Sequence, residues 1–333
     1  MKSRIRFVRW LSPLLGMALF FTLFVVFQET AFAQDYPNKP IRLVVPYVPG
    51  AGNDIVGRLL AGKLTESWKQ QVVVDNRAGG STIIGAEIVA KAPPDGYTIL
   101  FAADATLSIN PSLFKKLPYD AEKDFVPVIF LATSPFILTV NSSLPVKTVQ
   151  EFVAYAKSNP GKLNFGSVGL GSQHHIAGEL LNKRAGLNMT HIPYKGSAQA
   201  MPDLLGGRIQ CYFTGIVVAG PHLKSGKIRA LAIASEKRSP EMPDLPTFAE
   251  SGFPGFEIGF WFSLVAPAKT PNEIITKLNA ELNRILKLPD VQKSLTDQGF
   301  EIKGGTPADL SAHVKADIAR WAKFIKETNV RVE

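Results

Sequence analysis

Cysteine is nearly missing from this chain, because Cys211 is the only one among 333 residues. A single cysteine cannot form an intramolecular disulfide, so burial has to stabilise the fold even in an oxidising compartment. Apolar residues make up 46% of the sequence and charged residues 20%, an ordinary mixture for a globular protein. The composition therefore predicts a fold held together by a buried apolar core.

Long hydrophobic runs are also lacking, apart from one at residues 11–27. It follows residues 1–10, which carry lysine and arginine but no acid, and it precedes the small tripeptide Ala31-Phe32-Ala33. A spanning helix needs about 20 apolar residues, so the shorter run favours a cleaved secretory signal peptide over a retained membrane anchor. We expect residues 1–33 to be the signal peptide and the mature protein to be exported.

A strong charge pattern is absent as well. The net charge is +9, and the leader contributes to it with four basic residues and one acid. The other lysines and arginines are scattered and are not interleaved with aromatic residues, so nothing but the net sign supports nucleic-acid binding. A modest positive excess would steer small anions toward the protein.

Nucleotide and hydrolase motifs are missing too. Gly50-Ala51-Gly52 would need a glycine at position 55 to complete G-x-G-x-x-G, but Ile55 stands there, and no G-x-x-x-x-G-K-[ST] occurs. Ser167 and Ser172 have Phe165 and Leu170 two residues earlier, so the glycine of a nucleophile elbow is absent. We therefore expect no bound nucleotide cofactor and no enzyme activity.

A metal site would have to use the histidines. His174 and His175 are adjacent, so on a helix they point about 100° apart and cannot chelate one ion without distortion. His191 could join them, but no Cys, Asp or Glu falls at ligand spacing. We expect no metal, and we expect His175 to line the cleft or to pack beneath its loop.

Short β-branched runs alternate with helical periods from residue 41 onward, a pattern that predicts parallel strands joined by crossover helices. Strands are expected at residues 41–46, 72–75 and 98–102, and apolar runs follow at 126–132 and 136–140. Val56, Leu59, Leu60 and Leu64 form one face of a helix between the first two strands.

The same alternation restarts after residue 141. Helices are expected at 149–157, 172–183 and 197–205, and strands at 162–167, 189–193, 209–213 and 229–234. A proline-rich irregular segment, 239–255, leads to a returning strand at 258–266 and two long helices. We predict a two-lobed α/β protein, each lobe a mostly parallel sheet flanked by helices, with lobe I at 34–137 plus 256–333 and lobe II at 138–255.

Glycine-rich loops follow several of the predicted strands in both lobes. They read Tyr47-Val48-Pro49-Gly50-Ala51-Gly52-Asn53-Asp54, Arg77-Ala78-Gly79-Gly80-Ser81-Thr82 and Gly166-Ser167-Val168-Gly169-Leu170-Gly171-Ser172. In open α/β sheets, ligands bind at the carboxyl ends of strands, where helix N-termini favour anions. One such loop is a weak signal, but their recurrence in both lobes predicts an anion site.

Two further features have alternative interpretations. Asp104 follows the third predicted strand, where it would either cap the local backbone or meet an ammonium or hydroxyl group of a ligand. Trp261 and Phe262, in the returning strand, would either stack on a ligand or pack in the core.

Several motifs occur together in an order typical of one family. They are Tyr36-Pro37, Pro49-Gly50 through Asp54 and Arg58, Val74-Asp75-Asn76-Arg77, Pro93-Pro94-Asp95-Gly96-Tyr97, Ile109-Asn110-Pro111-Ser112-Leu113, Gly171-Ser172 with His175 and Ala177-Gly178-Glu179, Pro193-Tyr194-Lys195-Gly196, and Asp203-Leu204-Leu205-Gly206-Gly207. With them, nearly the whole chain after the leader resembles the substrate-binding proteins of tripartite tricarboxylate transporters, the Bug or TctC-like family.

The resemblance implies a periplasmic, monomeric receptor with the Venus-flytrap fold of periplasmic binding proteins. It implies that residues 47–54 and 167–175 hold a small organic carboxylate, which the closed protein delivers to membrane permease subunits. Family ligands include tricarboxylates, dicarboxylates, acidic amino acids and aromatic acids. Two alternatives stay open: a receptor that presents its ligand to a membrane sensor kinase, and a periplasmic enzyme on the same fold.

The candidate ligand-binding residues combine the glycine-rich loops with positions that the resemblance implies. They are Tyr47, Gly50, Ala51, Gly52, Asn53, Asp54, Ser81, Asp104, Ser167, Gly171, Ser172, His175 and Thr214. The chain departs from the family pattern at Ala51, where a second glycine is usual, and at Thr214, where an acid is frequent. Asp104 stands where small residues are common, so the resemblance does not identify the ligand.

We predict that the exported protein begins at or near Gln34, because the small tripeptide before it fits a signal-peptidase site. Intact-mass analysis of the periplasmic fraction should show loss of the leader. A full-length species embedded in the membrane would contradict this prediction.

Overall fold

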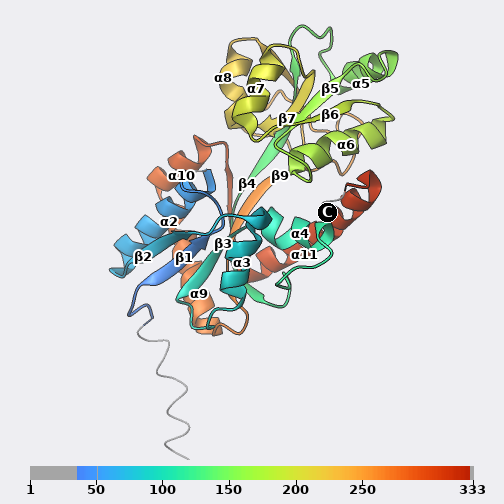
Figure 1. Ribbon diagram of the computed structural model, residues 1–333. Helices are drawn as coiled ribbons and strands as arrows, with labels where there is room; N and C mark the ends of the chain where they lie inside the picture. The colour runs from blue at the N-terminus through green and yellow to red at the C-terminus, as the bar shows by residue number, and fades with distance from the viewer. Residues whose placement is uncertain (1–35, 51, 331–333) are drawn as a thin grey trace, which may run out of the picture.

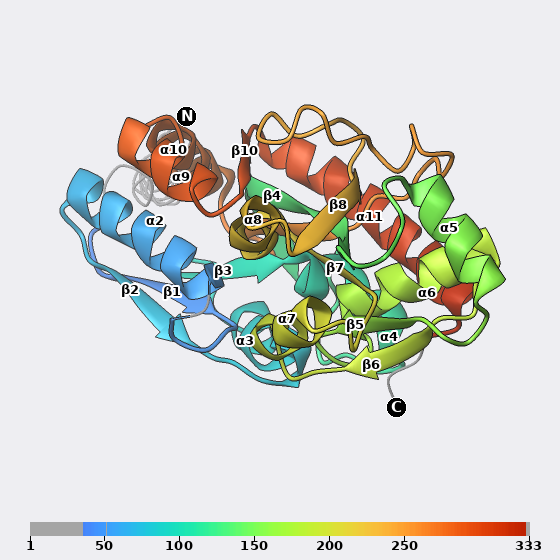
Figure 2. The same ribbon diagram turned by 90° about the horizontal axis from the view of Figure 1, so that it is seen from above.

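The computed structural model describes residues 36–50 and 52–330, so the predicted signal peptide lies outside the described residues. Two α/β lobes lie end to end and are joined by a long strand that runs through both (Figure 1, Figure 2). Within the described ranges, no helix combines the length and the apolar character that crossing a bilayer requires.

The first lobe is built on a mixed sheet. Its strands are β1 (Ile41–Val45), β2 (Val72–Asn76), β3 (Thr98–Ala103), β9 (Gly259–Pro267), β10 (Glu301–Gly304) and the first part of β4 (Phe125–Asn141). The order is β2-β1-β3-β9-β4, with β10 beside β4. The strands β1, β2 and β3 are parallel, whereas β9 runs antiparallel to both of its neighbours.

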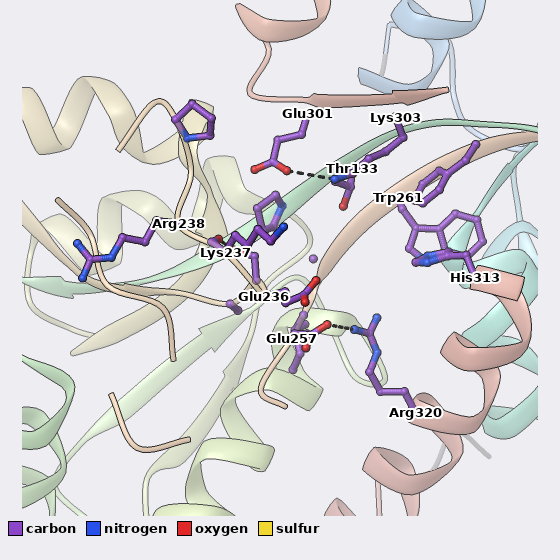
Figure 3. Close-up of a pocket in the computed structure, with 17 residues that line it drawn as sticks. Thr133, Glu236, Lys237, Arg238, Glu257, Trp261, Glu301, Lys303, His313 and Arg320 are labelled. Carbon is purple, nitrogen blue, oxygen red and sulfur yellow. Dashed lines mark hydrogen bonds and ion pairs between the residues drawn. The ribbon is translucent and has the colours of Figure 1, made fainter. Parts of the chain in front are cut away.

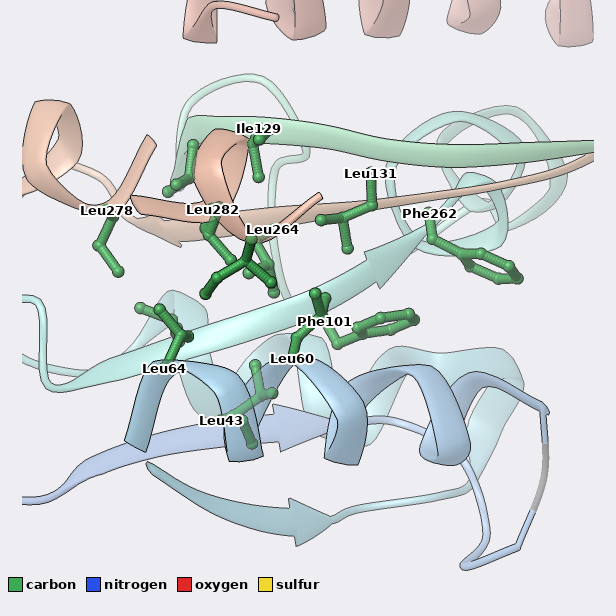
Figure 4. Close-up of a cluster of buried hydrophobic side chains, with 14 of the residues drawn as sticks. Leu43, Leu60, Leu64, Phe101, Ile129, Leu131, Phe262, Leu264, Leu278 and Leu282 are labelled. Atoms are coloured by element: carbon green, nitrogen blue, oxygen red, sulfur yellow. The ribbon is translucent and has the colours of Figure 1, made fainter. Parts of the chain in front are cut away.

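Helices and short turns cover this sheet and shape its carboxyl edge. They are α2 (Gly52–Trp68), the 3₁₀ turn η1 (Gly80–Thr82), α3 (Ile83–Ala90), the π-helix η2 (Ala105–Ile109), α4 (Asn110–Leu113), α9 (Asn272–Ile285), α10 (Pro289–Thr296) and α11 (Pro307–Thr328). Leu60 and Leu64 of α2 point toward Leu43 and Phe101 of the sheet (Figure 4), so the apolar face predicted for this helix is buried. Leu278 of α9 belongs to the same core.

The second lobe repeats the same build with fewer strands. Its elements are α5 (Val149–Ser158), β5 (Asn164–Ser167), α6 (Gln173–Ala185), β6 (Thr190–Pro193), α7 (Ser197–Leu205), β7 (Cys211–Gly215), α8 (Ile216–Lys224) and β8 (Ile228–Ile233). The strand β5 pairs in parallel with β6 and β7, and the last part of β4 pairs antiparallel with β7 and β8. Residues 239–255 form turns and bends, as the sequence predicts.

A single strand joins the two lobes where the sequence indicated two separate apolar runs. The strand β4 is continuous over 17 residues; its first part pairs with β9 and its last part with β7 and β8. Pro135, which has no N–H to give to a ladder, lies where β4 passes from one set of partners to the other. The proline therefore marks the crossing and does not end the strand.

The C-terminal helix α11 belongs to both lobes. Leu310 and Val314 pack in the first lobe, whereas Trp321 and Phe324 pack in the core of the second. The prediction that all of residues 256–333 belong to lobe I therefore does not describe the packing of this helix. An amphipathic stripe predicts that a helix is buried, but it does not identify the sheet against which each turn packs.

We predict that Gly178→Ala destabilises the protein, because an added Cβ would lie 2.1 Å from Cε2 of Phe165 in β5. Overpacking of this kind typically costs about 1–3 kcal/mol. The matched control is Gly62→Ala in α2, where an added Cβ meets nothing within 4 Å and the better helix propensity of alanine adds up to ~1 kcal/mol. Urea denaturation measures both variants, and equal midpoints would contradict the close packing of α6 on β5.

Candidate ligand-binding site

A cavity of about 420 Å³ lies between the lobes at the carboxyl ends of β1, β3 and β5. Six of the candidate residues line it: Tyr47, Asn53, Ser81, Asp104, Gly171 and Ser172. The first four come from the first lobe and the last two from the second, so the cavity brings together the glycine-rich loops that the sequence analysis singled out.

The loop after β1 is held by Asp54, which is buried and does not line the cavity. Its carboxylate accepts hydrogen bonds from the backbone N–H of Gly50 at 2.8 Å, Nε of Arg58 at 2.9 Å and Nδ2 of Asn76 at 2.8 Å. Burial alone would raise the pKa of Asp54, but these donors outweigh it and lower the pKa. Asp54 therefore shapes the loop and is not a ligand contact.

The turn after β2 adopts a backbone conformation that few side chains tolerate. Ser81 and Thr82 have φ values of 53° and 75°. Nδ2 of Asn110 donates to the carbonyl of Ser81 at 2.8 Å, and Oγ1 of Thr106 donates to Oγ1 of Thr82 at 2.8 Å. Left-handed non-glycine residues cost free energy and persist where the surroundings hold them, often at binding sites. Here they turn two hydroxyl-bearing residues into the cavity wall.

The loop before α6 is held from beneath. Oγ of Ser172 donates to the carbonyl of Gly169 at 2.7 Å and caps α6 by accepting from the N–H of His175. Nδ1 of His175 accepts from the N–H of Gly171 at 3.2 Å, and Oγ of Ser167 lies 2.6 Å from Nε2 of His191. Of the two interpretations of His175, the structure therefore supports packing beneath the loop.

Several candidate residues do not line this cavity. Gly50 and Gly52 are exposed outside the cavity, Ser167 and His175 support the loop from below, and Thr214 is buried within β7. Ala51 lies outside the described residues. A strand-end loop identifies the neighbourhood of a site, but the direction of each side chain depends on local φ and ψ values that no motif specifies.

The cavity also contains residues that the sequence analysis did not select. They are Thr82, Ala105, Ile109, Asn110, Leu113, Val168, Leu170, Gln173 and Phe260. Trp261 and Phe262, which were considered for stacking, are buried in the core, and their neighbour Phe260 lines the cavity instead. The sequence could have indicated Gln173, because this residue directly follows the N-cap residue Ser172 at the start of α6.

Asp104 connects the two lobes at the cavity wall. One carboxylate oxygen, Oδ1, accepts from the N–H of Ala105 at 2.7 Å, so Asp104 caps η2 as one interpretation predicted. The other oxygen accepts from Nε2 of Gln173 in α6 and from the N–H of Trp261 at 3.3 Å. The carboxyl group is buried, and burial together with the charge of Asp317 raises the pKa of Asp104.

A larger hollow of about 590 Å³ lies beside the crossing of β4 and β9. Figure 3 shows its charged lining, in which Glu257 pairs with Arg320 at 3.3 Å and Glu301 with Lys303 at 3.5 Å. Its lining comes from β4, β9, β10 and α11, together with residues that follow β8 and residues that precede β9. We take the smaller cavity as the candidate site, because it contains six of the candidate residues and is lined by residues at the starts of α2 and α6.

The chemistry of the cavity suits an anion held by neutral groups. Among the described residues that line it, none is Lys, Arg or His. Burial and the negative charge of Asp104 raise the pKa of Tyr47, so its phenol remains a hydrogen-bond donor at neutral pH. Across residues 36–50 and 52–330, no group of three His, Cys, Asp or Glu side chains could hold a metal ion.

Two α/β lobes that share the long strand β4 and enclose a cavity between their strand-end loops define a two-lobed solute-binding protein. The chain belongs to one particular family of this class, because the model of the tripartite tricarboxylate transporter family receptor, TctC, matches residues 56–330. This match confirms the resemblance found in the sequence.

Solved structures of related proteins agree with this assignment. The chain is similar to an R. palustris protein with adipate, at 39% identity and a TM-score of 0.77, over 89% of this chain and 99% of that one. It is similar to MatC from Rhodopseudomonas palustris with bound malate, at 34% identity and a TM-score of 0.73, over 87% and 100%. It is also similar to the periplasmic binding protein BugD, at 35% identity and a TM-score of 0.73, over 90% and 100%. These proteins are solute-binding proteins, not enzymes.

We predict that His174, beneath the cavity in α6, makes the protein sensitive to acid. Its ring stacks on Tyr212 at a centroid distance of 5.4 Å and packs at a tilt against Phe136 at 4.5 Å, and burial lowers the pKa of His174 to about 3. An unfolded histidine titrates near pH ~6.5, so below that pH the unfolded state binds a proton that the folded state rejects. This single group therefore lowers the free energy of unfolding by up to ~1.4 kcal/mol per pH unit as the pH falls from about 6.5 toward the folded pKa.

The variant His174→Phe should keep the stacking and remove this contribution. Urea denaturation at pH values from 7 down to about 4 should then show a shallower loss of stability than in the wild type. An unchanged pH dependence in a variant that folds normally would show that His174 does not remain neutral in the folded protein.

Proposed function

We propose that this protein is a periplasmic receptor that captures a small organic carboxylate between its lobes for uptake by a tripartite tricarboxylate-type transporter. Membership of the receptor family supports the transport role, and the adipate and malate present in two similar structures support the ligand class. The observation that carries the proposal is the cavity itself, whose walls combine the starts of two helices from different lobes.

The two helix starts suit a carboxylate. Asn53 lies in the first turn of α2, and Ser172 and Gln173 lie at the start of α6; all three line the cavity. Free N–H groups and the positive end of the helix dipole favour a negative charge at such positions. A carboxylate between the lobes would therefore receive donors from both of them and hold them together.

Side-chain hydroxyls complete the proposed anion site. Thr82 accepts a hydrogen bond from Thr106 at 2.8 Å, so its own hydroxyl proton is available for a ligand. Tyr47 keeps its phenol proton for the reason given above. The hydroxyl proton of Ser172, by contrast, is used by the carbonyl of Gly169, so this serine acts on the loop conformation.

Closure of the lobes is part of the proposal. The strand β4 passes from one lobe into the other, and β9 pairs with its first part. Just before β9, the carbonyl of Ile258 accepts from the N–H of Phe136 in β4, and the N–H of Ile258 donates to the carbonyl of Ala234 after β8. We propose that the lobes, at residues 34–137 plus 256–333 and 138–255, rotate about these strands when ligand binds. Because α11 packs on both lobes, the rotation would require either that the second half of this helix moves with the second lobe or that the helix bends.

We predict that Gly171→Val abolishes carboxylate binding. Gly171 lines the cavity, has a φ of 72° and gives its N–H to His175. A β-branched side chain there would occupy ligand space and strain the left-handed backbone. Isothermal titration calorimetry with adipate and malate should show measurable affinity for the wild type and none for the variant.

The matched control is Gly186→Val at the other end of α6. Gly186 also has a left-handed φ, of 63°, but an added Cβ there meets nothing within 4 Å and the residue lies outside the cavity. Backbone strain is therefore comparable, and this variant should bind like the wild type. Equal affinity in both glycine variants would place the ligand elsewhere, and a failure of the wild type to bind any carboxylate in a broad screen would refute the proposed function.

A further inference from the structure

The proposed carboxylate cavity contains an acidic side chain of its own. Of the described residues that line it, Asp104 is the only Asp, Glu, Lys, Arg or His. A cavity that takes up an anion would be expected to avoid a buried carboxyl group, because two negative charges at close range repel strongly where water is excluded. The presence of Asp104 therefore needs a physical account.

Donors of the protein do not fill all the hydrogen-bond acceptor positions of this carboxyl group. An ionised carboxylate has about four lone-pair positions. Three protein donors reach Asp104, namely the N–H groups of Ala105 and Trp261 and the amide of Gln173. Two of them share Oδ2, so Oδ1 keeps one acceptor position.

No positive charge balances Asp104 directly. Within the described chain, no Lys, Arg or His forms an ion pair with it. The nearest charged pair is Asp317 with Arg320 on α11, and Asp317 also accepts from Nε1 of Trp261 at 2.7 Å. Arg320 is thus engaged by Asp317 and by Glu257. Burial and the charge of Asp317 raise the pKa of Asp104, in agreement with a carboxyl group that lacks a compensating partner.

We propose that Asp104 selects the ligand: the cavity prefers carboxylates that also carry an N–H or O–H donor, above all an ammonium group, over dicarboxylates that carry none. This inference rests on the proposed function and names its substrate class. The carboxylate of the ligand lies at the helix starts, and its donor group pairs with the open position on Asp104. Ile109, Leu113 and Phe260 line the same cavity and contact the carbon chain between the two groups.

The preference has a direct physical origin. A ligand donor supplies the missing partner of Asp104, whereas a second carboxylate adds a further negative group to a cavity whose described lining contains no Lys, Arg or His. Sites whose buried polar group must be paired by the ligand discriminate strongly against analogues that lack the pairing group, and we expect a difference on the order of 100-fold in Kd.

The experiment compares ligands of equal length by isothermal titration calorimetry on the full mature protein. The four-carbon set is succinate, malate, aspartate and 4-aminobutanoate, and the six-carbon pair is adipate and 6-aminohexanoate. Within each length, the wild type should bind the best donor-bearing acid about 100-fold more tightly than the diacid without a donor. The ranking in the wild type tests the inference even if no variant folds.

The variant Asp104→Asn should then remove most of this preference, because its neutral amide neither attracts an ammonium group nor repels a carboxylate. The affinity for succinate or adipate should rise and that for the donor-bearing acids should fall. Glu122→Gln is the matched control, since it removes the same charge from an exposed position outside the cavity and should keep the ranking of the wild type.

The outcomes separate this inference from the proposed function. If succinate and adipate bind as tightly as their donor-bearing counterparts, or if Asp104→Asn keeps the preference, the inference is wrong and the carboxylate receptor stands. If neither these acids nor any other carboxylate in a broad screen binds to the wild type, the proposed function fails and the inference fails with it.

Discussion

The pairing of β4 with β9 is the constraint on which the rest of the molecule depends. One 17-residue strand serves both sheets, and β9 returns beside it, so the two lobes cannot be placed independently. This shared ladder sets the carboxyl ends of β3 and β5 opposite each other, and the cavity lies where those ends meet. The helix α11 adds a third connection, because its two halves pack in the cores of different lobes.

The cavity wall is shaped by buried side chains, most of which do not line the cavity themselves. Asp54 holds the loop after β1, Asn110 and Thr106 hold the left-handed turn of Ser81, and His175 holds the loop before α6. Each of these side chains forms a hydrogen bond with the backbone or with a neighbouring hydroxyl group. Such hydrogen bonds fix the φ and ψ angles of the loops. In the proposed function, such a site would bind an anion through neutral donors, because none of the described lining residues is Lys, Arg or His.

Polar contacts continue from the cavity to the far side of β9. Gln173 contacts Asp104, Asp104 accepts from the backbone of Trp261, and the indole of Trp261 donates to Asp317, which pairs with Arg320. Trp261, in β9, therefore links the candidate cavity to the charged hollow shown in Figure 3. Because Gln173 lies in the second lobe and Asp104 in the first, any rotation of the lobes must lengthen or re-form this contact.

The sequence by itself determined the two-lobed α/β architecture, most strands and long helices, and the three loops at the site, because hydrophobic period and glycine-rich strand ends are local patterns. It did not reveal that β4 is one strand, that α11 spans both lobes, or that Gln173 reaches Asp104. It also grouped His175 and Thr214 with residues that face the ligand. Only the tertiary structure decided these points, because strand partners, helix docking and side-chain direction depend on contacts between residues far apart in the chain.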